Sequence, residues 1–265
     1  AADDGHARLG AALFGADHVD DAVTHVAHAE ELDAIGADVL FQGLQLQTGL
    51  GVGDLRLWGR GVDGELFHPS KRSDALRAAW APAGERIVGY LGRLAPEKQV
   101  DDLHVLAGLP GTRVVVVGDG PERASLEQRL PDAVFTGQLR GEELAAAVAS
   151  FDVFVTPGEL ETFGQTIQEA MASGLPVVAP ASGGPVDLVD PSRTGWLYTP
   201  GDLLGLREHV ADLVGDDAKR RAMGRSAREA TEPRTWAAIC TQLVEHYAEA
   251  IALKREQEHT ARQMA

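Results

Sequence analysis

Short apolar runs alternate with amphipathic stretches from Leu55 onward. The apolar runs predict strands at 87–92, 114–118, 133–137, 152–157, 175–180 and 195–200, with a further short strand at 56–58. Amphipathic stretches predict helices at 73–80, 97–107, 121–130, 141–149, 164–173, 184–189, 202–214, 217–230 and 233–252. Continuous β-branched runs are typical of strands covered on both faces. This alternation, with short Gly/Pro loops, predicts a doubly wound parallel α/β sheet.

Residues 1–54 lack this regularity. They contain ten acidic residues, one arginine and no lysine, and the pattern indicates only a helix around 20–36. We therefore expect three parts: an atypical segment at 1–54, a folded domain at 55–252 and a charged tail at 253–265.

Composition excludes several classes of protein. The 265 residues carry 24 basic and 40 acidic side chains, a formal net charge of -16, which argues against nonspecific binding to nucleic acid or to an anionic membrane. The single cysteine, Cys240, excludes a disulfide framework. No apolar run approaches the roughly 20 residues of a membrane span. A small local basic pocket for phosphate remains compatible with this charge.

Ligands of such sheets bind at the carboxyl ends of the strands, so the loops after the strands carry the candidate chemistry. The first loop, GRLAPEK, holds Arg93 and Lys98 between a strand and a helix. Two cations beside a helix N-terminus can clamp a diphosphate, with Arg93 as a fork and Lys98 as a point charge. The alternative is two cations exposed on a surface loop.

The second loop, VVVVGDGPE, places Gly118 and Gly120 after a strand. Arg123 stands where a dinucleotide fingerprint needs its third glycine, so this motif argues against NAD. The loop is interpreted either as a ligand contact or as a tight turn that needs glycine.

The third loop and its helix place seven residues between Glu161 and Glu169. Carboxylates accept hydrogen bonds from vicinal hydroxyls, so the two groups suit a sugar ring and a ribose. Phe163 and Gly164 would present backbone N–H groups at the start of the helix. The structural alternatives are a capping carboxylate for Glu161 and a solvated helix face for Glu169.

A fourth loop, ASGGPVDLV, places Ser182, Gly183 and Gly184 before a helix that starts at Pro185. It suits backbone contacts to a ligand, or a turn. No Asp-x-Asp pair exists, and His25 and His28 lack a third ligand, so no metal site is predicted.

Taken together, the motifs from about Leu55 to Tyr247 resemble the C-terminal donor domain of glycosyltransferase family 4. They are WGRGVDGELFHP, GRLAPEK, VVGDGPE, FTGQLRGEEL, the Glu161-x7-Glu169 spacing and SGLPVVAPASGGPVDLV. The residues of the WGRGVD and RLAPEK motifs are most similar to those of actinobacterial GDP-mannose-dependent α-mannosyltransferases that act on lipid or glycolipid acceptors. The resemblance implies a Rossmann-like sheet that forms the C-terminal half of a GT-B fold, and sugar transfer with retention of configuration.

The resemblance also implies roles for individual residues. Arg93, Lys98 and Glu161 would be catalytic, and Arg93 and Lys98 would neutralise the departing nucleoside diphosphate without a metal. The nucleotide sugar, expected to be GDP-mannose, would be a co-substrate, and no cofactor is implied. Arg93 and Lys98 would bind the diphosphate, Glu161 with the Phe163 and Gly164 amides the hexose, and Glu169 the ribose. Gly118, Asp119, Gln138 and Leu139 would border the base, and Gly92, Thr162 and Gln165 would also bind the donor.

Family members carry an N-terminal acceptor domain of similar size, whereas only about 54 residues precede the match here. We therefore expect residues 1–54 to be an atypical or truncated remnant of that domain, and a frameshift upstream of about Gly51 is one hypothesis for it. The last helix would then expose apolar side chains at Trp236, Val244 and Tyr247. We expect a cytoplasmic enzyme, with peripheral membrane contact in a full-length protein. The alternatives are a catalytically inactive nucleotide-sugar-binding module and a related nucleotide-sugar 2-epimerase.

Overall fold

The computed structural model describes residues 58–264. The predictions for residues 1–54 therefore lie outside the described residues, as does most of the strand predicted at 56–58. Trp58, the last residue of that predicted strand, lies in a loop.

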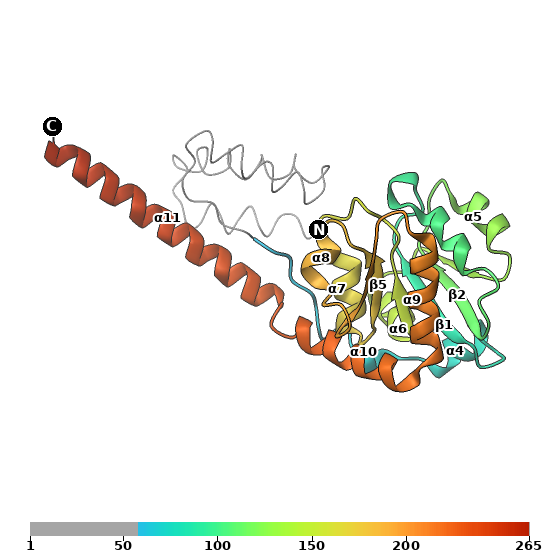
Figure 1. The fold of residues 1–265 in the computed structure, drawn as a ribbon. Helices are drawn as coiled ribbons and strands as arrows, with labels where there is room; N and C mark the ends of the chain where they lie inside the picture. Colours follow the sequence, from blue (N-terminus) through green and yellow to red (C-terminus); the bar gives the residue numbers. More distant parts are fainter. Residues whose placement is uncertain (1–57, 265) are drawn as a thin grey trace. The chain divides into compact units, whose positions relative to one another are not determined.

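The domain is built on one six-stranded, all-parallel sheet (Figure 1). Its strands are β1 (Arg86–Leu91), β2 (Thr112–Val117), β3 (Val134–Gly137), β4 (Val153–Val155), β5 (Val177–Pro180) and β6 (Gly195–Tyr198). The order across the sheet is β3-β2-β1-β4-β5-β6. This is the strand order of the Rossmann fold, and it confirms the predicted doubly wound sheet.

Helices follow the strands in alternation. The α-helices are α4 (Asp74–Trp80), α5 (Arg123–Arg129), α6 (Gly141–Ala149), α7 (Gln165–Ala172), α8 (Gly184–Leu188), α9 (Leu203–Gly215), α10 (Asp217–Thr231) and α11 (Trp236–Met264). The 3₁₀-helices are η3 (Pro69–Lys71), η4 (Pro96–Lys98) and η5 (Val100–Leu106). The predicted positions are confirmed to within a few residues, apart from two differences.

The first difference concerns the helix predicted at 97–107. Two 3₁₀-helices, η4 and η5, stand there, and Gln99 separates them in a left-handed conformation with a φ of 48°. A non-glycine residue rarely adopts this conformation, and it interrupts α-helical hydrogen bonding. The helical character predicted at 97–107 is therefore present, but as two 3₁₀-helices rather than one α-helix.

The second difference concerns the end of the chain. Helix α11 continues to Met264, whereas the sequence pattern ended it at Ala252. The stretch after Ala252 loses apolar periodicity but contains neither glycine nor proline, so nothing in it stops a helix. No residue of α11 is buried, and its Trp236 and Val244 are exposed while Tyr247 is half-buried. None of the described helices is long and apolar enough to cross a membrane.

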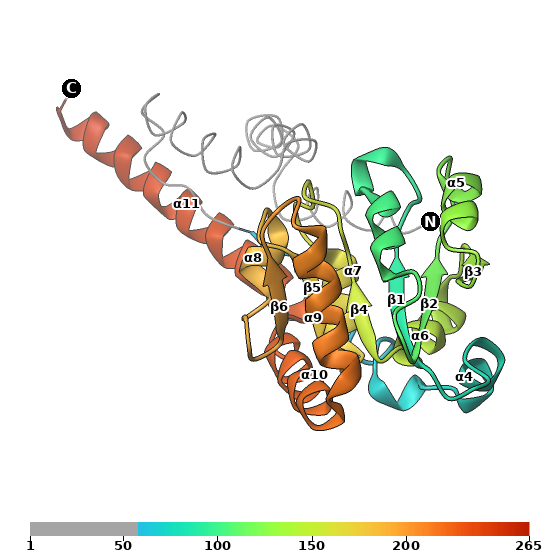
Figure 2. The same ribbon diagram turned by 45° about the vertical axis from the view of Figure 1, so that its right-hand side comes forward.

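Two hydrophobic clusters cover the two faces of the sheet, because successive strand residues point to opposite sides. Ile87 and Val115 pack with α6 and α7, whereas Val88 and Val116 pack with η5, α5 and α9. Figure 2 shows α9 on one side of the strands, with α6 and α7 on the other. The burial of both faces explains the β-branched runs of the sequence.

The strand order reverses between β1 and β4, which lie side by side in the sheet (Figure 2). The chain leaves β1 toward β2 on one side and leaves β4 toward β5 on the other. In open α/β sheets, the loops that diverge at this switch point leave a crevice in which ligands bind. Here the two diverging loops are the one after β1 and the one after β4.

Candidate functional site

Lys98 and Glu161 meet at this switch point. Lys98 ends η4 in the loop after β1, and Glu161 lies in the loop after β4. The Nζ of Lys98 donates to the Oε2 of Glu161 at 2.8 Å, and the two side chains are 34% and 18% exposed. The structure therefore brings together two of the three predicted catalytic residues.

Glu161 also shapes the start of α7. Its Oε1 accepts a hydrogen bond from the backbone N–H of Gly164 at 3.2 Å, which is a capping contact. Gly164 has a φ of 58°, and a Cβ there would lie 2.5 Å from the Leu188 side chain. The capping role considered for Glu161 is thus present, and the N–H of Gly164 that was expected to face a ligand donates to Glu161 in this structure.

Gln99 ties the two switch-point loops together. Its Oε1 accepts a hydrogen bond from the backbone N–H of Glu159 at 2.7 Å. Beside it, a Cβ on Gly158 would stand 3.3 Å from the Lys98 carbonyl oxygen, so the loops pack closely. Sequence reasoning missed Gln99, because nothing in the sequence marks a glutamine as the link between loops 60 residues apart.

The loop after β5 supports the Glu161 loop from its other side. The Ser182 hydroxyl donates to the Glu159 carbonyl at 3.0 Å, and the Gly184 N–H donates to the Glu161 carbonyl at 2.6 Å. Gly183 has a φ of 61°, and a Cβ there would stand 2.4 Å from the Glu161 carbonyl oxygen. These glycines are therefore needed for close backbone packing that holds Glu161 in place.

Arg93 takes a more open position. Its side chain is 67% exposed, and its Nη1 lies 3.3 Å from the Oε1 of Glu97 within the same loop. The Tyr90 hydroxyl donates to the Arg93 carbonyl at 3.0 Å and so fixes the backbone there. Burial raises the pKa of Tyr90, with a smaller contribution from the charge of Glu161. Arg93 thus carries an exposed side chain on a hydrogen-bonded backbone.

The loops after β1, β2 and β3 are joined by backbone hydrogen bonds. The Gly118 N–H donates to the Gly137 carbonyl at 2.9 Å, and the Leu94 N–H donates to the Asp119 carbonyl at 3.0 Å. A Cβ on Gly118 would stand 1.9 Å from the carbonyl oxygen of Gly92. The Gly-x-Gly pattern therefore meets a packing requirement, which was the structural alternative for this loop.

The side chains predicted around the base line this part of the sheet edge. The Oδ1 of Asp119 accepts from the Gly120 N–H at 2.8 Å, and its Oδ2 lies 3.3 Å from Arg123. Gln138 is exposed, whereas Leu139 is half-buried against the core. Whether they border a base stays a prediction.

Glu169 lies in α7, within reach of Gln165 one turn earlier. Burial raises the pKa of the Glu169 carboxyl to about 7, and a side-chain hydrogen bond with Gln165 partly offsets this shift. Gln165 itself donates to the Gly61 carbonyl at 3.2 Å. Glu169 is half-buried, so a fully solvated helix face does not describe it.

Phe163, in the loop after β4, is covered by Arg60, whose guanidinium carbon lies 4.5 Å from the centre of the ring. Such a cation–π contact contributes about 0.5–1 kcal/mol at an exposed site. Thr162, between Glu161 and Phe163, is half-buried, and a Cβ on Gly184 would stand 2.4 Å from its carbonyl oxygen. Arg60, in the loop before α4, thus helps to hold the loop between β4 and α7.

Among residues 58–264, no group of three or more His, Cys, Asp or Glu side chains is arranged to hold a metal ion. The charged groups at the switch point are therefore an ammonium, a guanidinium and carboxylates. Such a set can bind a polyanion and a polyol side by side.

Comparison with known proteins identifies the family of the chain. The family described as "Glycosyl transferases group 1" matches residues 72–230. The chain is 54% identical over 191 residues to a GDP-mannose-dependent alpha-mannosyltransferase of Mycolicibacterium smegmatis, covering 72% of this chain and 50% of that protein. It is 48% identical over 206 residues to the protein of the same description from Corynebacterium glutamicum, covering 77% and 50%.

A solved structure shows the same architecture. Sucrose-phosphate synthase from Thermosynechococcus elongatus superposes with a TM-score of 0.68 at 31% identity, over 77% of this chain and 54% of that one. The chain belongs to the group 1 glycosyl transferase family. It spans about half the length of the curated relatives it matches.

Proposed function

We propose that this chain carries the donor half of a retaining glycosyltransferase that takes a hexose, expected to be mannose, from GDP-mannose. The observation that carries the proposal is the Lys98–Glu161 pair at the switch point, which joins a phosphate-binding cation to a hydroxyl-binding carboxylate. The GDP-mannose dependence named for the two bacterial relatives supports the choice of donor.

In the proposed mechanism, the donor diphosphate lies against Lys98 and Arg93. The exposed Arg93 guanidinium turns from Glu97 toward the phosphates, where its planar fork fits two oxygens. Negative charge grows on the diphosphate as its bond to the hexose breaks, and the two cations stabilise that charge. On this account the departure of the leaving group needs no metal.

Glu161 and Glu169 hold the two sugars of the donor. Lys98 releases Glu161 when it engages the phosphates, and the freed carboxylate accepts hydrogen bonds from hexose hydroxyls. Glu169 accepts hydrogen bonds from the ribose, and Gly118, Asp119, Gln138 and Leu139 border the base. The intact set of charged groups favours a working donor site over an inactive module.

Transfer itself is proposed for the whole protein, because the cleft of a GT-B enzyme has two halves. We propose a lipid or glycolipid acceptor, and a cytoplasmic location with peripheral membrane contact. The test is calorimetric titration of the 265-residue chain with GDP-mannose, UDP-glucose and ADP-glucose. Saturable binding of GDP-mannose, with at least tenfold weaker binding of the others (about 1.4 kcal/mol), supports the proposal. Preference for another base would overturn the assignment of GDP-mannose.

A further inference from the structure

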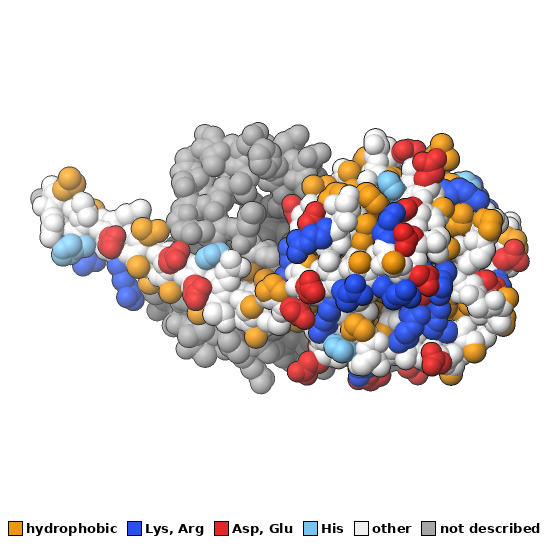
Figure 3. Space-filling model, turned by 60° about the horizontal axis from the view of Figure 1, so that its bottom comes forward, with side chains coloured by type: hydrophobic (Ala, Val, Ile, Leu, Met, Phe, Trp, Pro, Cys, Tyr) orange, Lys and Arg blue, Asp and Glu red, His pale blue; other side chains and the backbone are white. Residues whose placement is uncertain are grey.

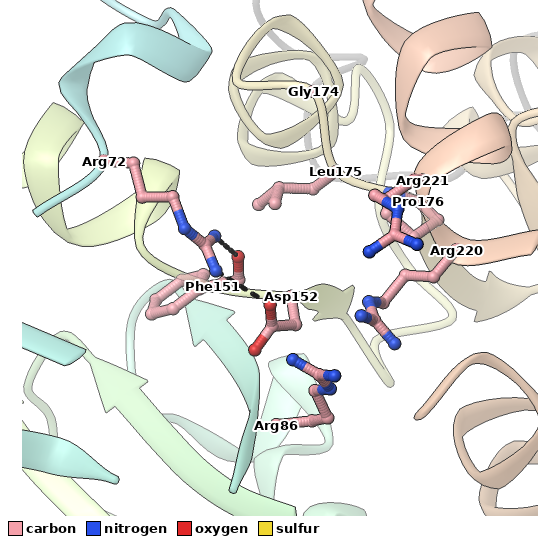
Figure 4. A pocket seen from close by; sticks show the side chains of 9 residues that line it. All are labelled: Arg72, Arg86, Phe151, Asp152, Gly174, Leu175, Pro176, Arg220 and Arg221. Atoms are coloured by element: carbon pink, nitrogen blue, oxygen red, sulfur yellow. Dashed lines mark hydrogen bonds and ion pairs between the residues drawn. The ribbon is translucent and has the colours of Figure 1, made fainter. Parts of the chain in front are cut away.

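A cavity of about 280 Å³ opens at the amino-terminal end of the sheet, on the opposite end of the strands from Lys98. It lies between the start of β1, the segment before β4, the turn before β5 and the start of α10. Its lining residues are Arg72, Arg86, Phe151, Asp152, Gly174, Leu175, Pro176, Arg220 and Arg221 (Figure 4). Four guanidinium groups and one carboxylate thus line it.

The carboxylate in the cavity, Asp152, is fully engaged. It lies 3.0 Å from Arg72 and 3.0 Å from Arg77, and it accepts the Ile87 N–H at 2.8 Å. Burial acts to raise its pKa, but these hydrogen bonds and the two arginines outweigh burial and hold the pKa of Asp152 below its ordinary value. Asp152 is therefore ionised and has little capacity to neutralise further cations.

A second carboxylate, Asp217 at the start of α10, is shared by three arginines. It lies 2.6 Å from Arg220, 2.8 Å from Arg86 and 3.4 Å from Arg221. The hydrogen bond from Arg220, with the charges of all three, lowers the pKa of Asp217. Five guanidinium groups therefore share two carboxylates around this cavity, which leaves three formal positive charges.

Several N–H donors of these arginines are available to a ligand. A guanidinium has five donors, and Arg221, whose side chain is 64% exposed, meets Asp217 through Nη1 alone. Arg86 meets Asp217 through Nη2. Figure 4 shows the guanidinium groups of Arg86, Arg220 and Arg221 turned toward the space beside Asp152.

The surroundings of the cavity are basic, although the chain as a whole has a net charge of -16. Figure 3 shows Lys and Arg side chains gathered on this face of the domain. A local positive field in an acidic protein attracts anions to that place rather than over the whole surface.

We propose that this cavity is a binding site for a phosphoryl group, separate from the donor site. A phosphate monoester carries a charge of about −1.5 to −2 and three acceptor oxygens, which matches guanidinium forks that converge from β1 and α10. The group belongs either to a soluble phosphate or to a phospholipid whose headgroup is a phosphate monoester, as in phosphatidic acid, since both present three free oxygens.

The test is calorimetric titration of the full chain with inorganic phosphate, in an Arg93→Ala, Lys98→Ala background, which removes both cations assigned to the donor site. Saturable binding is expected, weakened at least tenfold by adding Arg221→Gln together with Arg86→Gln. Arg225→Gln is the matched control, because Arg225 is exposed on the same helix but does not line the cavity. It should change the affinity less than twofold.

A second arm measures flotation with phosphatidylcholine vesicles that contain phosphatidic acid, using the same variants. If vesicle binding ranks the variants in the same order as phosphate affinity does, the phosphoryl group belongs to a lipid. Phosphate binding without vesicle binding assigns the group to a soluble ligand. Absence of saturable binding to both probes, or equal weakening by Arg225→Gln, would overturn the proposal. Circular dichroism of each variant separates loss of the site from loss of the fold.

Discussion

Lys98 and Glu161, 63 residues apart in the chain, form an ion pair of 2.8 Å between the loops that diverge at the switch point of the sheet. Each group satisfies the other while no donor is bound. The half-buried pair places both side chains at the site before a donor arrives. Donor binding then exchanges one set of charged contacts for another.

If donor binding replaces the Lys98–Glu161 contact, removing the Glu161 charge should affect the affinities for GDP and GDP-mannose differently. In Glu161→Gln, Lys98 loses its carboxylate partner, so GDP should bind as well as in the parent chain or more tightly. The affinity for GDP-mannose should fall about tenfold or more relative to the affinity for GDP, because a charge-assisted hydrogen bond contributes about 1.5–3 kcal/mol. Calorimetry with both ligands measures the ratio.

The matched control is Glu159→Gln, which removes the same charge two residues away and leaves the Lys98 contact in place. It should leave the ratio of the two affinities within about twofold. Equal losses for GDP and GDP-mannose in Glu161→Gln would show that Glu161 does not contact the hexose.

Gln99 is expected to act as a positioning residue. Gln99→Ala removes the hydrogen bond to Glu159, so it should lower the free energy of unfolding by about 1 kcal/mol. It should also weaken the binding of GDP-mannose several-fold, whereas the affinity for GDP should change little. Gln99→Gly loses the same bond but relieves the φ of 48°, and it should be more stable than Gln99→Ala by about 1 kcal/mol. Chemical denaturation and calorimetry measure the two effects.

Both Gln99 variants should show the same loss of GDP-mannose affinity, although their stabilities differ. The exposed Gln128 of α5 provides the control, and Gln128→Ala should change neither property. Affinity that simply follows stability across the series would argue against a role in placing the Glu161 loop.

Gly183 is expected to be intolerant of a side chain. In Gly183→Ala, the new Cβ would stand 2.4 Å from the Glu161 carbonyl, at a φ of 61°. The strain should lower the free energy of unfolding by about 1–3 kcal/mol. Displacement of the loop that carries Glu161 should also weaken the binding of GDP-mannose. Gly215→Ala serves as the control, since nothing lies within 4 Å of a Cβ at Gly215. Thermal unfolding should show that control unchanged or slightly stabilised; a stable Gly183→Ala with full affinity would contradict the packing argument.

The raised pKa of Glu169 predicts two opposite dependences on pH. Its pKa is about 7 in the folded chain against an ordinary 4.5, so the folded chain holds a proton that the unfolded chain releases between these values. The contribution of Glu169 to stability therefore falls as the pH rises through this window and levels off above about 7. Denaturation of Glu169→Gln should lack this component.

Donor affinity should move the other way, because only the ionised carboxylate accepts two hydrogen bonds from the ribose. GDP-mannose should bind roughly tenfold more tightly at about pH 8 than at about pH 6, since the ionised fraction changes by that factor around a pKa near 7. Binding by Glu169→Gln should be weaker and nearly independent of pH. The same pH slope in that variant would assign the titration to another group.

The sheet could be predicted because its signal is local. Runs such as VVVVG at 114–118 predict strands buried on both faces, and glycine and proline mark the turns between them. The paired loops of the site could be anticipated from the same rule, because carboxyl ends of parallel strands share one edge. Lys98 and Glu161 were singled out for that reason, and they meet.

The remaining features depend on contacts between distant segments. The left-handed Gln99 and its bond to Glu159 exist only because two loops pack together, and no local pattern encodes them. The arginines around Asp152 and Asp217 come from four separate elements, so their convergence was also invisible in the sequence. The extension of α11 was missed because apolar periodicity, the signal used, fades before the helix ends.

The most direct measurement is calorimetric titration of GDP-mannose into the full chain and into its Lys98→Ala and Glu169→Ala variants. Our account predicts saturable binding by the parent chain and at least tenfold weaker binding by both variants (about 1.4 kcal/mol each), with all three chains folded by circular dichroism. Unchanged affinity in both variants, or no binding by a folded parent chain, would contradict the claim that the loops after β1 and β4 form the donor site.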